Sequence, residues 1–213
     1  MTWPAAVLWD LDGTLADTEP LWMAAEHALA ERFGRVWTEE DALALIGSDL
    51  MTAGEHLRRH FDADMTAAQI VDFLVQRVGA GLQDGVAWRP GAKELVTAFA
   101  AAKVPQALVT MSYAVLAEPI ARQLPFAAVV TGDAVSRGKP HPEPYLTAAA
   151  QLGVDAAACL AIEDSVTGAA SATAAGCEVL VVPHMVRVPD GPRRRTLPSL
   201  AGTTPDTLRT LFA

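Results

Sequence analysis

Two aspartates, Asp10 and Asp12, stand two positions apart directly after the apolar run 5–9. Such a run predicts a buried strand, and alternation along a strand places residues i and i+2 on the same face. Gly13 allows the backbone to turn immediately afterwards. Two carboxylates held this close repel each other, so the pair calls for a cation, a shared proton or a division of catalytic labour. An ordinary acidic turn is the alternative, because Asp and Gly are favoured in turns for local backbone reasons.

Polar side chains also follow later apolar runs, and one lysine precedes a predicted helix. These groups are Thr110, Met111 and Ser112 after the run 106–109, Glu163, Asp164 and Ser165 after the run 159–162, and Lys139. In an open parallel sheet, ligands bind beyond the carboxyl ends of the strands, so we expect all of them at one edge. Taken singly, VTMS and EDS could be helix caps, and the lysine a surface residue. Their joint occurrence favours a functional site.

The elements that must position these groups fall into two blocks. Between positions 15 and 86 the chain is rich in Ala, Leu, Glu and Arg, with apolar residues at helical spacing. Further helices are expected there at 38–47, 53–61 and 66–78. Glycines at 79, 81 and 85 then loosen the chain, which indicates the exit from an inserted helical domain spanning residues 17–85.

The remainder of the chain alternates between helices and short apolar strands. Helices are expected at 91–102, 113–123, 142–152, 166–175 and 205–212, and strands at 106–109, 127–130, 159–162 and 178–182. Strands bounded by helices, with runs such as LVVP and LAIE, indicate a parallel sheet covered on both faces. The predicted fold class is therefore α/β, a doubly wound parallel sheet, formed by residues 1–16 and 86–213.

Four motifs, DLDGT, VTMS, GKPHPEPY and IEDS, occur in this order along the whole chain. On these motifs the chain resembles the haloacid dehalogenase superfamily, in its phosphatase and phosphomutase branch with a helical cap inserted after the first motif. The resemblance implies a Rossmann-like core, a helical cap and a small phosphate ester as substrate.

The resemblance also implies separate roles for the site residues. Asp10 is the nucleophile that attacks phosphorus and forms an aspartyl-phosphate, and Asp12 is the general acid toward the leaving oxygen and then the base toward water. Lys139 neutralises the phosphoryl group and the nucleophile, while Thr110 and the backbone N–H of Met111 hold the non-bridging oxygens. Many phosphatases of this branch have asparagine where this chain has Met111. The backbone N–H can still bind phosphate there, so the difference affects only the contact that an asparagine side chain would make.

Attack by a carboxylate on a phosphate dianion is electrostatically unfavourable without a cation. A hard divalent cation with oxygen ligands meets this need, and Mg²⁺ suits a site with few carboxylates plus waters. By the resemblance, Asp10 and Asp164 supply side-chain oxygens and Asp12 its backbone carbonyl, which leaves the carboxyl of Asp12 free for proton transfer. Glu163 is expected to support the metal site indirectly, with direct ligation as the alternative.

The segment DTEPLW resembles phosphatases that act on small sugar or sugar-alcohol phosphates, which is the leading hypothesis. Isomerisation of the β-phosphoglucomutase kind is the alternative. Those mutases carry a histidine where this chain has Trp22, and an arginine where GSDL places Asp49 or Leu50. Dehalogenases lack the second aspartate of the first motif, so Asp12 argues against their chemistry. The intact acids, lysine and hydroxyl also disfavour a binding protein without turnover.

Composition narrows the partners further. A net charge of −9 disfavours nucleic acid as the main partner, because such affinity depends on clustered Lys and Arg. Arg193, Arg194 and Arg195 form the one dense basic run, and a solvated surface loop is the favoured interpretation of it. His141 lies close to Lys139 in sequence, and for it a capping or surface role is favoured over a place in the site.

Cys159 and Cys177 lie in apolar sequence without metal-ligand spacing and are expected to be buried, reduced thiols. No uninterrupted apolar run approaches the roughly 18 residues needed to span a bilayer. We therefore expect a cytoplasmic protein, without nucleic-acid or membrane partners, that acts as a monomer on a small molecule.

Overall fold

The computed structural model describes residues 4–213, and its centre is a six-stranded parallel sheet. The strands are β1 (Val7–Trp9), β2 (Gln106–Val109), β3 (Ala128–Val130), β4 (Leu160–Glu163), β5 (Glu178–Val181) and β6 (Arg194–Thr196). Their order is β3-β2-β1-β4-β5-β6, and every neighbouring pair is parallel. The predicted α/β class with a doubly wound parallel sheet is confirmed.

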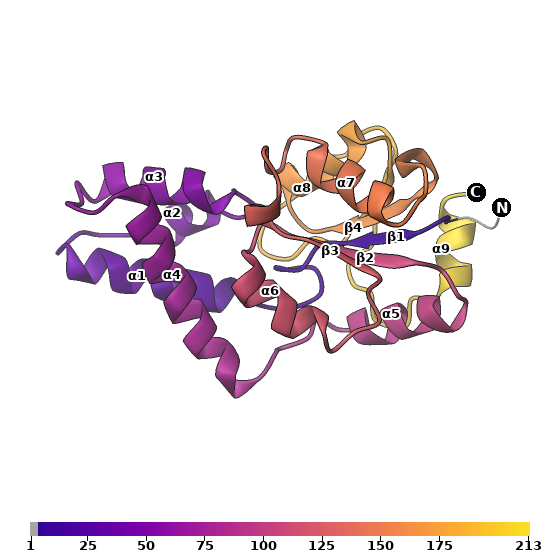
Figure 1. Ribbon diagram of the computed structural model, residues 1–213, viewed down its shortest axis with the longest axis horizontal. Helices are drawn as coiled ribbons and strands as arrows, with labels where there is room; N and C mark the ends of the chain where they lie inside the picture. The colour runs from indigo at the N-terminus through magenta and orange to yellow at the C-terminus, as the bar shows by residue number, and fades with distance from the viewer. Residues whose placement is uncertain (1–3) are drawn as a thin grey trace.

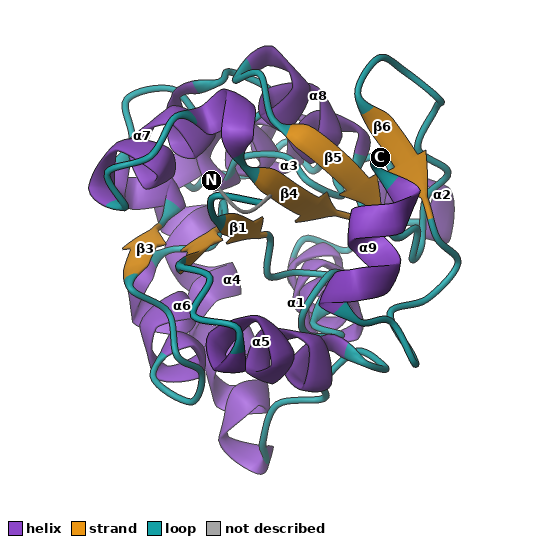
Figure 2. Ribbon diagram, turned by 90° about the vertical axis from the view of Figure 1, so that its right-hand side faces the viewer, coloured by secondary structure: helices purple, strands orange, loops and turns teal. Residues whose placement is uncertain are grey.

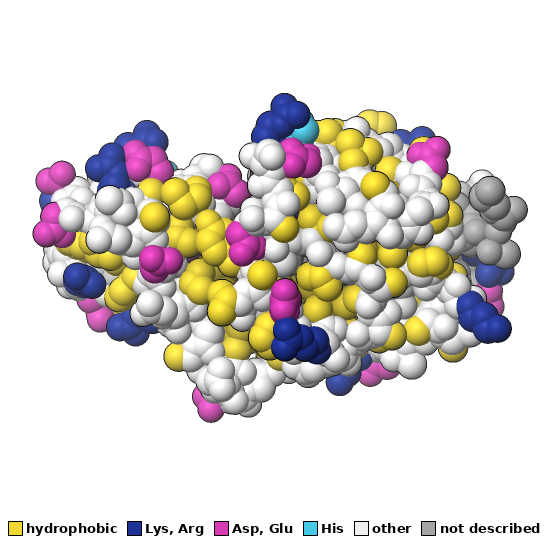
Figure 3. Space-filling model, viewed as in Figure 1, with side chains coloured by type: hydrophobic (Ala, Val, Ile, Leu, Met, Phe, Trp, Pro, Cys, Tyr) yellow, Lys and Arg dark blue, Asp and Glu magenta, His cyan; other side chains and the backbone are white. Residues whose placement is uncertain are grey.

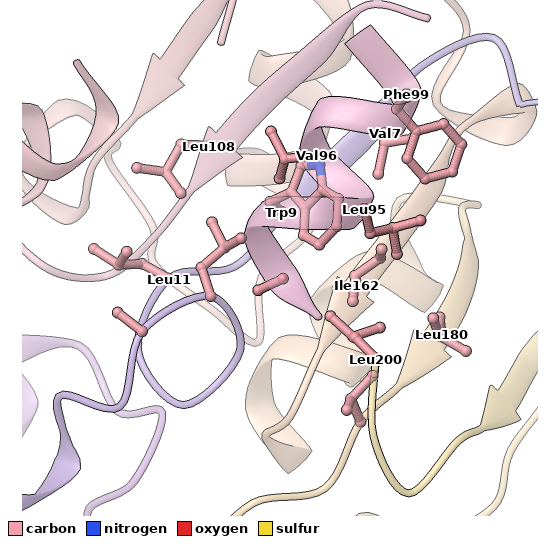
Figure 4. Close-up of a cluster of buried hydrophobic side chains, with 14 of the residues drawn as sticks. Val7, Trp9, Leu11, Leu95, Val96, Phe99, Leu108, Ile162, Leu180 and Leu200 are labelled. Carbon is pink, nitrogen blue, oxygen red and sulfur yellow. The ribbon is translucent and has the colours of Figure 1, made fainter. Parts of the chain in front are cut away.

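Helices cover both faces of this sheet (Figure 2). They are α5 (Ala92–Ala101), α6 (Ala114–Ala121), α7 (Glu143–Gln151), α8 (Val166–Ala174) and α9 (Pro205–Leu211), with short 3₁₀ turns at Gly132–Ala134 and Ala156–Ala158. Alternation along β1 explains the two layers, because Trp9 packs with Leu95 and Phe99 of α5 whereas Leu8 packs on the side of α7 and α8. Figure 4 shows the first of these clusters around Trp9.

Four further helices form a separate lobe beside the sheet (Figure 1). They are α1 (Glu19–Arg32), α2 (Glu39–Leu43), α3 (Leu50–His60) and α4 (Ala67–Gly81), followed by a 3₁₀ turn at Leu82–Asp84. This lobe has its own buried apolar cluster, which includes Leu29, Leu57, Phe61, Ile70 and Leu74. Burial of this cluster stabilises the helices, because helices of this length are marginal alone in water.

Local sequence sets where these helices begin. The Thr38 and Thr66 side chains cap α2 and α4 in reciprocal capping boxes, and Asp49 caps α3 by accepting from the backbone of Thr52. The helix expected at 38–47 is shorter than predicted, since α2 ends at Leu43 and turns follow it up to position 47.

The two chain segments that join the lobe to the sheet run side by side. Ala16 bridges to Trp88 in antiparallel fashion, and the Asp17 amide donates to the Ala87 carbonyl at 2.7 Å. That residues 17–85 form a domain of their own stays a prediction. A loop beyond β5 also touches the first segment, because His184 Nε2 lies 2.9 Å from Asp17 Oδ1.

The basic run was predicted as a loop, and this prediction is wrong for two of its residues. Arg194 and Arg195 belong to β6, a three-residue edge strand paired only with β5. Its residues are polar and half or fully exposed, so it lacks the apolar alternation by which strands are recognised. Figure 3 shows one face of the molecule, on which Lys and Arg are dispersed among acids and apolar groups.

Within residues 4–213, none of the helices combines the length and the hydrophobicity of a membrane span. Cys159 and Cys177 are buried free thiols, as expected. Burial raises the pKa of Cys159 to about 11 and that of Cys177 to about 12, so both remain protonated at neutral pH.

Candidate active site

Asp10 and Lys139 form a buried ion pair at the carboxyl end of the sheet. Asp10 directly follows β1, and its amide continues the pairing with β4 by donating to the Ile162 carbonyl. Lys139 Nζ lies 2.7 Å from Asp10 Oδ1, 2.6 Å from Glu163 Oε1 and 2.9 Å from the Val109 carbonyl. All three donors of the ammonium group thus have partners, and its side chain is only 2% exposed. A buried charge of this kind is tolerated because it is paired and hydrogen-bonded.

Glu163 also holds the lysine, together with Asp10. Its Oε1 accepts from Tyr145 at 2.5 Å as well as from Lys139, and its Oε2 accepts from Ser165 at 3.1 Å. Gly168 faces this carboxylate so closely that a Cβ atom there would lie 2.0 Å from Oε1. Both oxygens of Glu163 are therefore engaged by protein donors, an arrangement that suits the predicted supporting role.

Asp12 accepts four side-chain hydrogen bonds, two at each carboxylate oxygen. From the helical lobe, Thr18 donates to Oδ1 at 2.6 Å and Trp22 Nε1 at 3.2 Å. From the segment after β2, Thr110 donates to Oδ2 at 3.0 Å and Ser112 at 2.8 Å. The carboxyl group is thus oriented jointly by the sheet and by the start of α1.

Asp164 provides the test of whether a cation fits here. One oxygen each of Asp10, Glu163 and Asp164 lie within 4.8 Å of one another. Asp164 Oδ2 is buried and has no hydrogen-bond partner among the described residues, whereas Thr14 donates to Oδ1 at 3.3 Å. Gly13 keeps the approach to Oδ2 open, since a Cβ there would lie 2.1 Å from it. An unpartnered buried carboxylate oxygen is costly, and a cation beside it would remove that cost.

The pKa values of these acids reflect the same excess of negative charge. Burial, reinforced by the charge of Glu163, raises the pKa of Asp10 to about 7, although Lys139 opposes the shift. Burial, reinforced by Asp10, raises the pKa of Asp164 well above its ordinary value. The carboxylates in turn raise the pKa of Lys139 against the effect of its burial, so the ammonium stays charged.

A pocket opens between the sheet and the helical lobe at these groups. From the sheet side it is lined by Asp10, Asp12, Met111, Ser112, Lys139 and Ser165, and from the helical side by residues of α1, α3, α4 and the segment 42–48. Met111 is only 6% exposed, and its sulfur accepts from the Lys139 amide at 3.2 Å. Its side chain therefore helps to hold the loop that carries the lysine.

The structure brings together most of the predicted site residues, and it places Thr110 differently from the others. Asp10, Asp12, Met111 and Lys139 all line the pocket. Thr110 is fully buried behind it, and its hydroxyl proton is directed to Asp12. Contact of Thr110 with a phosphoryl oxygen stays a prediction.

Sequence reasoning did not place three further side chains at the site, although it noted Trp22 as the position where the mutases have histidine. Thr18 and Trp22 lie in the predicted helical domain, and Tyr145 lies in a helix whose apolar pattern indicates only core. A buried hydroxyl beside a buried acid has no signature in sequence spacing. For His141 a capping or surface role was favoured. Its Nδ1 accepts a hydrogen bond from the Glu143 amide at the start of α7, which is a capping interaction.

A sequence model of the haloacid dehalogenase-like hydrolase family matches residues 4–176. The chain belongs to this family. It is 36% identical over 185 residues to hexitol phosphatase A of Escherichia coli, covering 82% of this chain and 81% of that protein. Family membership and relatives of this kind make the chain a phosphatase within the family.

Two solved structures place the fold among known ones. CbbY from Rhodobacter sphaeroides, in complex with xylulose-(1,5)-bisphosphate, is 27% identical with a TM-score of 0.87, covering 97% of this chain and 99% of that one. β-Phosphoglucomutase from Clostridium difficile has a TM-score of 0.82 at 17% identity, covering 98% and 96% of the two chains, which shows a shared fold.

Proposed function

We propose that the chain is a magnesium-dependent phosphomonoester hydrolase, acting through an aspartyl-phosphate on a small phosphorylated metabolite, foremost a sugar or sugar-alcohol phosphate. The observation that carries the proposal is the arrangement at the pocket floor. There Asp10 is paired with Lys139, and Asp12 is oriented by four hydrogen bonds beside it. The hexitol phosphatase relative supports the substrate class. We infer that the enzyme acts as a monomer in the cytoplasm.

In the first step a carboxylate oxygen of Asp10 attacks phosphorus, and the bond from phosphorus to the ester oxygen breaks. Asp12 gives its proton to that departing oxygen, so an alcohol leaves. Lys139, held between Asp10 and Glu163, neutralises charge that gathers on the phosphoryl oxygens. Its position is fixed before the substrate arrives, so no reorganisation is needed during the reaction.

In the second step Asp12, now deprotonated, takes a proton from water as the water attacks phosphorus. The bond between phosphorus and Asp10 breaks, inorganic phosphate leaves, and both aspartates return to their starting states. The two pairs of donors around Asp12 orient its carboxylate for this second transfer.

The residues that would hold Mg²⁺ are Asp10 and Asp164, with the backbone carbonyl of Asp12 as the third protein ligand by resemblance. The unpartnered Oδ2 of Asp164 and the three clustered carboxylates support this set. The ion would supply positive charge that offsets repulsion between the nucleophile and the phosphate dianion. Glu163 supports the site by holding Lys139 and Tyr145.

Isomerisation of the β-phosphoglucomutase kind is the alternative. Two positions disfavour it in this chain. Trp22 directs an indole N–H at Asp12, and an indole cannot relay protons as an imidazole can. Asp49, which stands in the loop where those mutases have arginine, caps α3 and carries the opposite charge.

The test is a panel of sugar and sugar-alcohol monophosphates, with and without Mg²⁺, followed by phosphate release and by chromatography of the sugar products. We expect inorganic phosphate and the free alcohol, dependent on Mg²⁺. An isomerised sugar phosphate without phosphate release would establish the mutase instead. Equal turnover in chelator and in Mg²⁺ would refute the metal requirement.

A further inference from the structure

The helical side of the pocket carries its own acidic groups, both on one stripe of α1. Glu19, Trp22, Met23 and Glu26 occur at positions i, i+3, i+4 and i+7, and all four line the pocket. Trp22 touches Asp12, and Glu26 lies one helical turn further on, about 6 Å along the axis. Glu26 therefore lies at the depth where the far end of a leaving group several carbon atoms long would be.

These two glutamates are nearly buried and have unused hydrogen-bonding capacity. Each is only 6% exposed. Trp37 Nε1 donates to Glu26 Oε2 at 2.9 Å, whereas Oε1 has no donor in the described chain. The Glu19 carboxyl group has no hydrogen-bond partner among residues 4–213 although it lines the pocket. These carboxyl oxygens border the pocket, so they are available to pair with a hydrogen-bonding group of a bound molecule.

The charge of the pocket restricts what that molecule carries. Lys139 is the one Lys, Arg or His side chain among the residues that line it, and all its donors are engaged by Asp10, Glu163 and Val109. A second phosphate or a carboxylate on the leaving group would thus be buried beside Glu19 and Glu26 without a counter-charge. Burying an unpaired charge costs several kcal/mol.

The pocket also disfavours the charged forms of Glu19 and Glu26, as their raised pKa values indicate. Burial raises the pKa of Glu26 to about 7, and burial together with Asp12 and Asp10 raises that of Glu19 to about 8. At neutral pH each carboxyl group therefore exists partly as the acid, which donates, and partly as the anion, which accepts. A hydroxyl group pairs with both forms, because it is itself donor and acceptor.

Apolar side chains form another part of the pocket wall. Leu45, Leu50 and Leu74 line the pocket there and offer contact to a carbon chain. An uncharged, hydroxyl-bearing chain can form hydrogen bonds with the glutamates and apolar contacts with the leucines. An anionic chain would place a second negative charge beside the glutamates.

We propose that the leaving group is an uncharged polyol, that Glu26 selects it by exchanging a hydrogen bond with the hydroxyl farthest from the phosphate, and that the pocket rejects leaving groups bearing a second anion. This inference rests on the proposed phosphatase function and narrows its substrate class. It also separates this chain from the structurally similar CbbY, whose solved complex contains a bisphosphate.

The experiment compares kcat/KM for five phosphate esters: glucitol 6-phosphate, its 1-deoxy analogue, glucitol 1,6-bisphosphate, 2-phosphoglycolate and the short ester 2-hydroxyethyl phosphate. Wild type is expected to prefer glucitol 6-phosphate over its 1-deoxy analogue by about tenfold, the value of one hydrogen bond to a charged group. It is expected to disfavour both anionic leaving groups, glycolate and glucitol monophosphate, by about 100-fold. Equal rates within threefold for the bisphosphate and the monophosphate would overturn the inference and leave the phosphatase function intact.

Variants separate recognition from a structural role of Glu26. Glu26→Leu should abolish the preference for the distal hydroxyl, and Glu26→Gln, which keeps a donor and an acceptor, should retain it. Glu31→Gln, at an exposed site on the same helix, is the matched control and should equal wild type. Equal losses on glucitol 6-phosphate, its 1-deoxy analogue and 2-hydroxyethyl phosphate in Glu26→Leu would indicate a structural role and refute the inference. If Glu26→Leu does not fold, loss of the preference in Glu26→Gln refutes it equally. No phosphate release by wild type from any ester would refute the proposed function itself.

Discussion

The two ends of the pocket hold similar acidic groups in opposite circumstances. At the sheet end, Lys139 and Glu163 have every charged atom engaged, and Asp12 accepts four hydrogen bonds. At the helical end, Glu26 has one partner and Glu19 has none among the described residues. The groups at the sheet end are already held in place by protein contacts. At the helical end, carboxyl oxygens of Glu19 and Glu26 remain available to pair with a bound molecule. Under the proposed function, the sheet would carry out the reaction and the helical lobe would choose the substrate.

The largest effect is expected at the sheet end. Replacement Asp10→Asn removes the nucleophile and should lower kcat for phosphate release by more than about 10⁴-fold, since groups acting as a unit fail together. The fold should persist, because the amide is isosteric and Glu163 still pairs with Lys139. Phosphate release and circular dichroism measure the two outcomes. Substantial turnover by a folded variant would remove Asp10 from its proposed role.

Lys139→Met should combine loss of activity with loss of stability. We expect kcat to fall about 10³-fold, as for other groups that stabilise transition-state charge. The free energy of unfolding should fall by about 3 kcal/mol, because Asp10 and Glu163 lose their counter-charge. Urea unfolding at neutral pH measures this. An unchanged midpoint would mean that the sheet end is less tightly organised than its contacts indicate.

Asp164→Asn addresses the metal rather than the nucleophile. Removal of one carboxylate ligand should raise the half-saturating Mg²⁺ concentration at least about tenfold, with partial recovery of kcat at high Mg²⁺. Titration of activity with Mg²⁺ tests this, and Asp133→Asn, on the exposed surface, provides a control. Unchanged Mg²⁺ dependence would exclude Asp164 as a ligand.

The smallest effect is expected at the helical end and depends on pH. The pKa of Glu26 is raised from its ordinary 4.5 to about 7 in the folded chain, so the folded state binds more protons between these values. Its contribution to stability is therefore greatest at low pH and falls as pH rises from about 4.5 to about 7. Glu26→Gln should lack this component and gain about 3 kcal/mol on wild type at pH 8 relative to pH 4.5. Thermal or urea unfolding at both pH values measures it, and parallel profiles would show that Glu26 is not perturbed.

The sequence was sufficient to predict five of the six strands and the acids at the edge of the sheet. Asp10, Asp12 and Asp164 follow apolar runs, and in a parallel sheet such positions converge by geometry alone. Family resemblance then separated their expected roles. The apolar runs themselves sufficed for β1, β2, β4 and β5, which are buried on both faces.

What the sequence did not reveal depends on contacts between distant segments. Glu26 and Trp37 read as ordinary helical and loop residues, and only the packing of the helical lobe buries them together. Tyr145 reaches Glu163 from a helix whose pattern indicates core. The strand β6 depends on pairing with β5, since its own residues favour no strand. Such features arise from tertiary structure and have no local pattern.

The paired segments at Ala16 and Trp88 also bear on how the chain folds. Residues in β1 and β2 that pair, such as Val7 and Gln106, are separated by roughly 100 residues, a slow closure for a parallel sheet. If the helical lobe forms first on its own apolar cluster, it brings positions 16 and 88 together and shortens the remaining loop to about a quarter. The entropic free-energy cost of closing the loop between β1 and β2 then falls by about 1 kcal/mol. The helical lobe would in this way also help the sheet to form, by holding together the two chain segments that lead into it.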